Sequence, residues 1–236
     1  MLEVTHLSAG YGAATVLEDV SMSVAEGTFV VLTGPNGHGK TTLLRVLSGL
    51  LPANRGEMVF RGERLNGRSA ATIVGRGLVH IPQGDLLFVD LTVEQNLYMG
   101  AYLAEAWRRR RDRVRRVYEL FPRLEERRSQ QARTLSGGER RMLGIGRGLM
   151  SNAKLLMVDE PALGLAPVLV QEVYATLQRI ARSEATVLLV EETLANAREI
   201  ADYVYLMDTG RIVHEGAMAD FAADVLASTY LGHHGS

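Results

Sequence analysis

The chain has 236 residues, and its 26 basic residues against 27 acidic ones give a formal net charge of −1 at pH 7. This length suits one large α/β domain or one domain with an inserted sub-domain, and the balanced charge gives no argument for binding nucleic acid or an anionic membrane. The sequence contains no cysteine, which excludes disulfides and thiolate metal sites and agrees with a reducing compartment.

No stretch approaches the roughly 18 to 20 apolar residues that span a bilayer. Residues 1–7 lack the basic and apolar regions of a signal peptide. We therefore expect a cytoplasmic protein that reaches a membrane only through a partner.

Short strand-like runs at residues 2–7, 20–24 and 28–32 are separated by turns that contain glycine. Tyr11 lies between the first two, flanked by glycines. Its ring can stack on a flat base, with Val16 beneath it. The alternative is an ordinary turn tyrosine; we favour stacking because of the motif that follows.

Residues 34–42 fit the pattern G-x-x-x-x-G-K-[ST] of a phosphate-binding loop, between a β-rich run and apolar residues at helical spacing. Glycines let backbone N–H groups turn toward phosphate oxygens, and the helix N-terminus adds positive potential. We expect Lys40 to contact the β- and γ-phosphates and the Thr41 hydroxyl to ligate Mg²⁺. The residues expected at the phosphates are Asn36, Gly37, His38, Gly39, Lys40, Thr41 and Thr42.

A strand at 56–61, a short helix at 70–75 and a buried strand at 78–81 follow, and the last of these leads into Gln83. A residue at the C-terminal end of a strand lies where α/β sheets bind ligands. The Gln83 amide can therefore bridge Mg²⁺ and an attacking water, or it can simply cap a loop.

Residues 84–134 show helical patterns in place of strands: 92–95 form a capping box, and a helix is expected over 107–121 with seven arginines between 108 and 116. A sub-domain whose charged surface faces solvent or a partner is favoured over a nucleic-acid site. The apolar run 86–89 is expected either in a docking groove or as core filling. The apolar line of the 107–121 helix consists of Trp107, Val114, Val117 and Phe121.

A helix is expected to open at residues 135–139 and to run to about residue 150. Ser136 and Glu139 have capping-box spacing, but a cap does not require Gly137 and Gly138, which weaken a helix. Bare N–H groups at a helix N-terminus bind anions, so we expect a second phosphate contact from Ser136, Gly137 and Gly138.

The run 154–160 predicts a buried parallel strand that ends in two acids. Charges there are costly unless they meet a cation or a polar site. We expect Asp159 to hold Mg²⁺ through its water shell and Glu160 to polarise the attacking water. Plain surface charge is the alternative.

The remaining pattern predicts a helix over 167–181, a buried strand over 186–190 that ends in Glu191 and Glu192, another helix, a hairpin of 203–207 and 211–214, and a terminal helix over about 218–231. His233 and His234 are too few to argue for a metal.

With Tyr11, the loop 34–42, Gln83, residues 135–139 and residues 155–160 in this order, the chain resembles the nucleotide-binding subunit of ABC transporters over nearly its whole length. The resemblance implies an α/β P-loop NTPase fold with a mainly parallel core sheet, an N-terminal antiparallel β sub-domain and an inserted α-helical sub-domain. It implies one nucleotide-binding domain over 1–236, with the ATP-binding core at 1–83 and 135–236 and the helical sub-domain at 84–134.

The resemblance also implies a mechanism. Two such subunits, in a homo- or heterodimer, pack head to tail, so that Lys40 of one and Ser136 of the other bind the same ATP with Mg²⁺. Closure of the dimer then drives transmembrane permease subunits. The protein is therefore expected on the inner face of the cell membrane, and no nucleic acid is expected as a partner.

Four sequence segments resemble the second ATPase of branched-chain amino acid uptake systems: 135–139, 145–147, 160–167 and 190–192. Such importers also use an extracytoplasmic solute-binding protein and two different ATPases. The expected function is ATP hydrolysis for import of branched-chain or other hydrophobic amino acids. The alternatives are a urea or amide importer of the same branch, a soluble ABC ATPase acting on DNA or ribosomes, and a regulatory subunit with little turnover.

Two residues depart from the family pattern. Glu139 replaces the commoner Gln, which the capping box accommodates. Glu192 stands where most ABC ATPases have a switch histidine, and an ionised carboxylate can only accept hydrogen bonds and would repel the γ-phosphate. We expect Glu192 to turn away or to reach phosphate only through water or Mg²⁺, which leaves hydrolysis slow.

Overall fold

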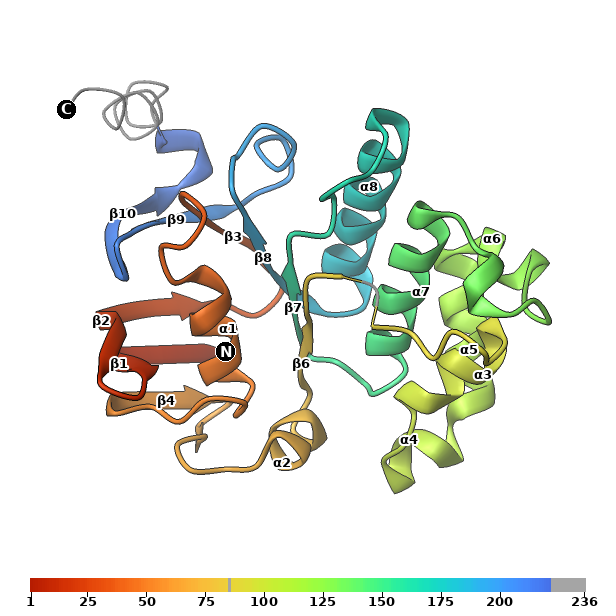
Figure 1. Ribbon diagram of the computed structural model, residues 1–236, viewed down its shortest axis with the longest axis horizontal. Coiled ribbons are helices and arrows are strands. Elements are labelled where there is room, and N and C mark those ends of the chain that lie inside the picture. Colours follow the sequence, from red (N-terminus) through yellow and green to blue (C-terminus); the bar gives the residue numbers. More distant parts are fainter. Residues whose placement is uncertain (85, 222–236) are drawn as a thin grey trace.

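The computed structural model describes residues 1–84 and 86–221 (Figure 1). The strands are β1 (Leu2–Tyr11), β2 (Ala14–Val24), β3 (Phe29–Thr33), β4 (Arg55–Phe60), β5 (Glu63–Arg64), β6 (Leu78–Ile81), β7 (Leu155–Asp159), β8 (Thr186–Glu191), β9 (Tyr203–Asp208) and β10 (Arg211–Ala217). The α-helices are α1 (Lys40–Leu47), α2 (Ala70–Gly75), α3 (Val93–Gly100), α4 (Ala104–Arg108), α5 (Arg110–Leu120), α6 (Pro122–Glu126), α7 (Gly137–Leu149) and α8 (Pro167–Ser183).

These strands form two sheets. The larger has the order β10-β9-β3-β8-β7-β6, and all its pairings are parallel except β9–β10. The smaller has the order β2-β1-β4-β5 and is antiparallel. The predicted mainly parallel core sheet with an N-terminal antiparallel sheet is therefore confirmed. Helices α3 to α7 are inserted between β6 and β7, which are neighbours in the core sheet.

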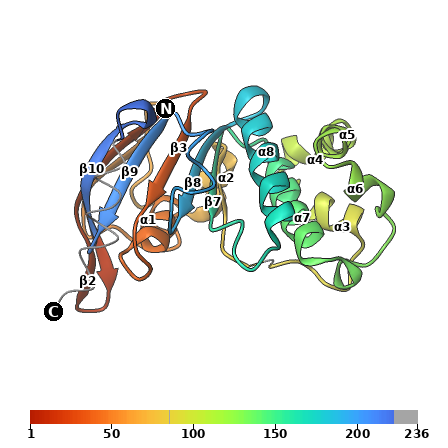
Figure 2. The ribbon, with the colours of Figure 1, turned by 90° about the horizontal axis from the view of Figure 1, so that it is seen from above.

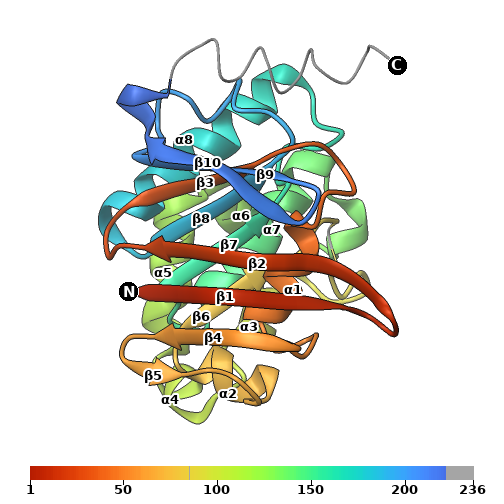
Figure 3. The ribbon, with the colours of Figure 1, turned by 90° about the vertical axis from the view of Figure 1, so that its left-hand side faces the viewer.

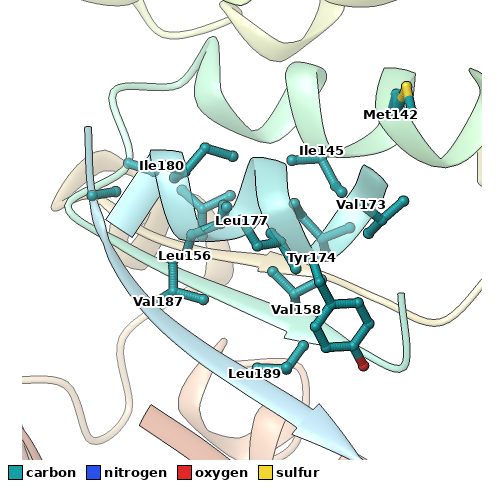
Figure 4. Close-up of a cluster of buried hydrophobic side chains, with 14 of the residues drawn as sticks. Met142, Ile145, Leu156, Val158, Val173, Tyr174, Leu177, Ile180, Val187 and Leu189 are labelled. Atoms are coloured by element: carbon teal, nitrogen blue, oxygen red, sulfur yellow. The ribbon is translucent and has the colours of Figure 1, made fainter. Parts of the chain in front are cut away.

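The core sheet is covered on both faces (Figure 2). One face packs against α1 and the antiparallel sheet, which lies nearest the viewer in Figure 3. The other face packs against α7 and α8, where Leu156 and Val187 meet Leu177 and Ile180 (Figure 4). Because both faces are covered, every residue of β3 and β7 is buried, as their continuous apolar runs indicate.

The helix expected over residues 107–121 is broken at Arg109 into α4 and α5. Val114, Val117 and Phe121 are buried as predicted. Trp107 does not share that packed face: it is 47% exposed, and the Arg110 guanidinium lies 4.1 Å from the centroid of its ring. The break explains the error, because it rotates Trp107 out of register with the residues of α5.

The helix expected after Glu192 is also wrong. Residues 195–200 form consecutive turns, in which Ala197 and Ile200 donate to the third residue before them while Arg198 and Ala201 donate to the fourth. This mixture of bonds prevents a regular helix. Of the terminal helix predicted over 218–231, residues 218–220 form a 3₁₀ turn and Phe221 is extended. Residues 222–231 lie outside the described residues, as do His233 and His234. Within the described part of the chain, no helix is long and apolar enough to cross a membrane.

Candidate active site

The loop between β3 and α1 takes backbone conformations that require glycine. Gly34, Gly37 and Gly39 have φ angles of 149°, 82° and 102°. A Cβ atom on Gly34 would lie 2.0 Å from the Met207 carbonyl oxygen, so no side chain fits there. Gly39 directly precedes α1, so the backbone N–H groups of the loop lie next to those of the helix N-terminus. This is the arrangement that binds an anion.

Lys40 folds back over this loop. Its ammonium group donates hydrogen bonds to the carbonyl oxygens of Gly34, at 2.7 Å, and Pro35, at 3.0 Å, and the residue is only 4% exposed. Burial lowers the pKa of Lys40, and the carboxylates of Glu160, Glu192 and Asp159 oppose that shift. The predicted acids and the predicted phosphate-binding lysine therefore lie within electrostatic reach of one another.

Asp159, the last residue of β7, is a buried acid. It is 1% exposed, and neither of its carboxylate oxygens has a hydrogen-bond partner among residues 1–84 and 86–221. Burial raises the pKa of Asp159, while the neighbouring Thr41 hydroxyl and the Lys40 charge oppose the rise. A buried carboxylate with free oxygens is costly unless it meets a cation, so Asp159 and Thr41 fit a Mg²⁺ ion, which prefers oxygen ligands.

Glu160 has a left-handed backbone conformation, with φ of 43°, and is 8% exposed. The Gln83 side-chain Nε2 donates to its Oε2 at 2.8 Å. Burial raises the pKa of Glu160; Lys40 opposes this effect, and the nearby Asp159 and Glu192 add to it. A non-glycine residue in this conformation costs about 1–3 kcal/mol, and such strain is concentrated at functional sites.

Glu192 does not turn away from the phosphate loop. Its Oε2 accepts a hydrogen bond of 3.0 Å from the Asn36 side-chain amide, and its backbone oxygen accepts one of 3.2 Å from Thr33 Oγ1. Of the two alternatives expected for Glu192, turning away is therefore wrong, because Asn36 offers a donor within reach. Contact with phosphate through water or Mg²⁺ stays a prediction.

Glu191, the last residue of β8, is a half-buried acid for which the sequence predicted no role. The Tyr174 hydroxyl of α8 donates to its Oε1, and burial raises the pKa of Glu191 to about 7. Burial likewise raises the pKa of Tyr174. The available signal was a second acid pair at the end of a buried strand.

Tyr11 is held in place by a side chain from another element. It lies at the end of β1, is 44% exposed, and its hydroxyl accepts a hydrogen bond of 3.0 Å from Arg45 Nη1 of α1. This bond from Arg45 lowers the pKa of the Tyr11 phenol. The half-buried Val16 lies next to the phosphate loop: a Cβ atom added to Gly39 would lie 3.4 Å from the Val16 backbone oxygen. The ring is therefore partly exposed beside α1, the helix that follows the phosphate loop, where a base can stack.

Ser136 caps α7 in a complete capping box with Glu139, as predicted, and Arg127 holds the Glu139 carboxylate at 2.7 Å. Gly138 also has a packing role, since an added Cβ would lie 3.0 Å from Leu169 of α8, while one on Gly137 would lie 3.6 Å from Leu165. α7 and α1 lie on opposite faces of the core sheet (Figure 2).

The segment after Gln83 is anchored by two arginines of α7. Arg141 donates to the Gly84 carbonyl at 3.2 Å, and Arg147 donates to that of Leu86 at 2.8 Å. The Arg147 guanidinium also lies 5.6 Å from the centroid of the Phe88 ring. Leu86 and Phe88 are 67% and 48% exposed and border a cavity of about 340 Å³, whereas the half-buried Leu87 between them packs against the core.

Comparison with known proteins shows the family to which the chain is similar. A family model described as "ABC transporter" matches residues 17–163. The chain is 42% identical to the high-affinity branched-chain amino acid transport ATP-binding protein BraG of Pseudomonas aeruginosa, over 98% of this chain and 100% of that protein. It is 34% identical to a probable branched-chain amino acid transport ATP-binding protein, LivF, of Archaeoglobus fulgidus, over 92% of each chain.

Among solved structures, the ADP conformation of an ATP-binding cassette of an ABC transporter superposes with a TM-score of 0.87 at 26% identity, covering 98% of both chains. A nucleotide-free ATP-binding cassette from an ABC transporter superposes with a TM-score of 0.86 at 25% identity, again over 98% of both chains.

Proposed function

The chain belongs to the ABC transporter family as an ATP-binding, ATP-hydrolysing subunit, and from this membership we propose that it drives the import of branched-chain amino acids. The observation that carries the proposal is the 42% identity to a branched-chain amino acid transport ATP-binding protein along the full length of that relative. The chemistry rests on the acids at the strand ends and on Lys40.

We assign phosphate binding to the loop from Asn36 to Thr42 and base stacking to Tyr11 above Val16. The buried oxygens of Asp159, which have no hydrogen-bond partner within residues 1–84 and 86–221, support a Mg²⁺ site shared with Thr41 and Gln83. When bound, the metal ion supplies charge neutralisation for the transferred phosphoryl group.

We assign the reaction itself to Glu160. In this proposal, Glu160 orients a water molecule for in-line attack on the γ-phosphorus and takes up a proton as the new P–O bond forms. The bond between the β–γ bridging oxygen and the γ-phosphorus breaks to give ADP and phosphate. The Gln83 amide, 2.8 Å from Glu160 Oε2, holds the carboxylate in position for this step.

We propose that the working unit is a head-to-tail dimer, with this chain or with a second nucleotide-binding subunit. Ser136, Gly137 and Gly138 stand at the N-terminus of α7, which lies across the sheet from α1. This placement supports their use by the ATP of the partner subunit. Within one domain over 1–236, residues 1–83 and 135–236 would form the core and 84–134 the helical sub-domain.

We further propose that the permease docks against the exposed run at Leu86 and Phe88. The cavity beside it is also lined by Met99 and Tyr102, and both of these residues are about half exposed. Docking there would place the protein on the inner face of the membrane through its permease, with the solute-binding protein acting only indirectly. Arg141 and Arg147 would transmit movement of this run to α7 and Ser136.

One observation favours slow ATP hydrolysis at the site that contains Glu192. The Glu192 carboxylate lies at the loop, on Asn36, where it would repel a γ-phosphate. We therefore propose that Glu192 slows turnover and that faster hydrolysis occurs in the partner subunit of a heterodimer.

The test is uptake of radiolabelled leucine by cells whose copy of this chain carries Glu160→Gln, with urea uptake measured in parallel. Loss of leucine uptake with unchanged urea uptake is the expected result. Loss of urea uptake alone would move the assignment to an amide importer, and unchanged uptake of both would reject the importer function.

A further inference from the structure

The tip of the phosphate loop is fastened to the turn between β9 and β10, which is remote in sequence. We propose that His38 is a positioning residue whose imidazole, bound to Asp208, locks the phosphate loop against this turn in its nucleotide-binding conformation. The proposal rests on the nucleotide site proposed above, and it gives the His38 side chain a role other than contact with phosphate.

The imidazole is held by its Nδ1 atom, which lies 2.7 Å from Asp208 Oδ1. A carboxylate accepts, so His38 donates to Asp208 in the tautomer that is protonated at Nδ1. In the other tautomer, Nδ1 accepts the hydrogen bond of 3.1 Å that the Thr209 N–H donates to it, which also ties the ring to this turn. The Thr209 hydroxyl donates to the same Asp208 oxygen at 2.9 Å. The His38 and Asp208 side chains are only 23% and 28% exposed, so this contact is partly shielded from water.

The backbone makes the same connection. The Gly210 N–H donates to the His38 carbonyl oxygen at 3.0 Å. Gly34 approaches Met207 so closely that an added Cβ would lie 2.0 Å from its oxygen, and one on Gly39 would lie 3.5 Å from the Gly210 Cα. Three positions along the loop therefore lie against one hairpin.

The other side of this turn touches β2. The Gly210 carbonyl accepts from the Glu18 N–H at 2.9 Å, and an added Cβ on Gly210 would lie 2.0 Å from the Val16 oxygen. Arg211 and Glu18 form an ion pair across the same junction, at 2.5 Å. The turn between β9 and β10 therefore packs between the phosphate loop and the part of β2 that contains Val16, which is expected beneath the base.

The physical benefit is preorganisation. A glycine loop binds phosphate through the directions of its N–H groups, and ordering each flexible residue costs roughly 1–2 kcal/mol, with glycine losing the most freedom. A side-chain contact that orders the loop before the ligand arrives removes part of that cost from binding. The carboxylate partner strengthens this hydrogen bond relative to a neutral one.

The test uses the full chain and four variants: His38→Ala, Asp208→Ala, the double variant and Asp208→Asn, which keeps an acceptor oxygen. Amide hydrogen exchange of Gly37 and Gly39 without nucleotide, and affinity for ADP, are measured for each. We expect both single alanine variants to speed exchange and to weaken ADP binding by roughly five- to tenfold, the size of one hydrogen bond. The double variant should be no worse than either, and Asp208→Asn should recover most of the loss.

Additive losses of ADP affinity in the double variant would overturn the proposal. A loss of ADP affinity in His38→Ala that Asp208→Ala does not share would also overturn it, because it would indicate direct contact of His38 with phosphate. Unchanged exchange in both single variants would also overturn it. If the unmodified chain failed to bind ADP, the proposed site would fall, while the exchange measurements would still decide whether His38 orders the loop. Thermal unfolding checks that each variant is folded. If one alanine variant fails to fold, amide exchange in the other still decides whether the contact between His38 and Asp208 orders the loop.

Discussion

The Gln83 side chain donates a 2.8 Å hydrogen bond to Glu160 and so joins the ends of β6 and β7. The two residues are 77 positions apart in sequence. Because parallel strands end at the same edge of a sheet, this pair lies where α/β proteins bind ligands. The proposed chemistry is centred on this contact.

Glu160→Gln should reduce ATP turnover by at least about 100-fold, because a positioned acid or base contributes that much, while ATP affinity remains. The exposed Glu172 of α8 offers a matched control, since Glu172→Gln removes the same charge from a surface position. Turnover should also fall with acid at a higher pH than for an exposed glutamate, because burial raises the pKa of Glu160. Equal turnover in both variants would reject Glu160 as the base.

Tyr11→Ala should weaken ATP binding by about tenfold, as loss of one base-stacking ring does. Tyr11→Phe keeps the ring and loses only the hydroxyl that Arg45 holds, so it should have a much smaller effect. Fluorescence titration with ATP checks both variants. Equal losses in the two would show that the hydroxyl contact, not the ring, matters.

Glu192→His should raise turnover of the assembled complex by roughly tenfold, because a donor aimed at the γ-phosphate replaces an acceptor that repels it. Glu192→Gln should give a smaller gain in the same direction. Steady-state phosphate release measures both. An unchanged rate in Glu192→His would contradict the proposed slowing role.

Glu191→Gln should change how stability depends on pH. The pKa of Glu191 is raised from 4.5 to about 7 in the folded state, so between these values the folded chain holds a proton that the unfolded chain has lost. Stability from this group is therefore full below pH 4.5 and is lost as pH rises to about 7. Relative to the Gln variant, the wild type should lose up to about 3 kcal/mol between pH 5 and pH 8. Urea unfolding of both proteins at several pH values checks this, and parallel curves would refute it.

Phe88→Ala should weaken binding of the permease complex by about tenfold, the scale of a central apolar contact, and leave ATP affinity unchanged. Val213 is also about half exposed but lies on β10, so Val213→Ala is the control. Binding is measured with permeases in lipid nanodiscs. A deficit in the control as large as that in Phe88→Ala would move the docking surface elsewhere.

The phosphate loop and the acid-bearing strand ends could be predicted because their signals are local. Apolar runs such as β7 and glycines that need positive φ are visible within a few residues. The contacts that tune the site were not visible, because each joins remote segments: Arg45 to Tyr11, His38 to Asp208, and Tyr174 to Glu191. Their pairing depends on how helices and hairpins pack on the sheet.

The errors in secondary structure have a similar origin. Nothing in the arginine-rich run marks the break at Arg109, since neither glycine nor proline is present there. The turns after Glu192 contain helix-forming residues, but Leu194 and Ala197 are buried in a segment too short for regular helical bonds to dominate.

The most direct test of the central claim is ATP hydrolysis by the purified chain, alone and then with its permeases and a partner ATPase in lipid, with Glu160→Gln in parallel. We predict turnover that appears or rises sharply only in the assembly and disappears in the variant. Turnover by the isolated chain that ignores the permeases would contradict the importer function and indicate a soluble ATPase.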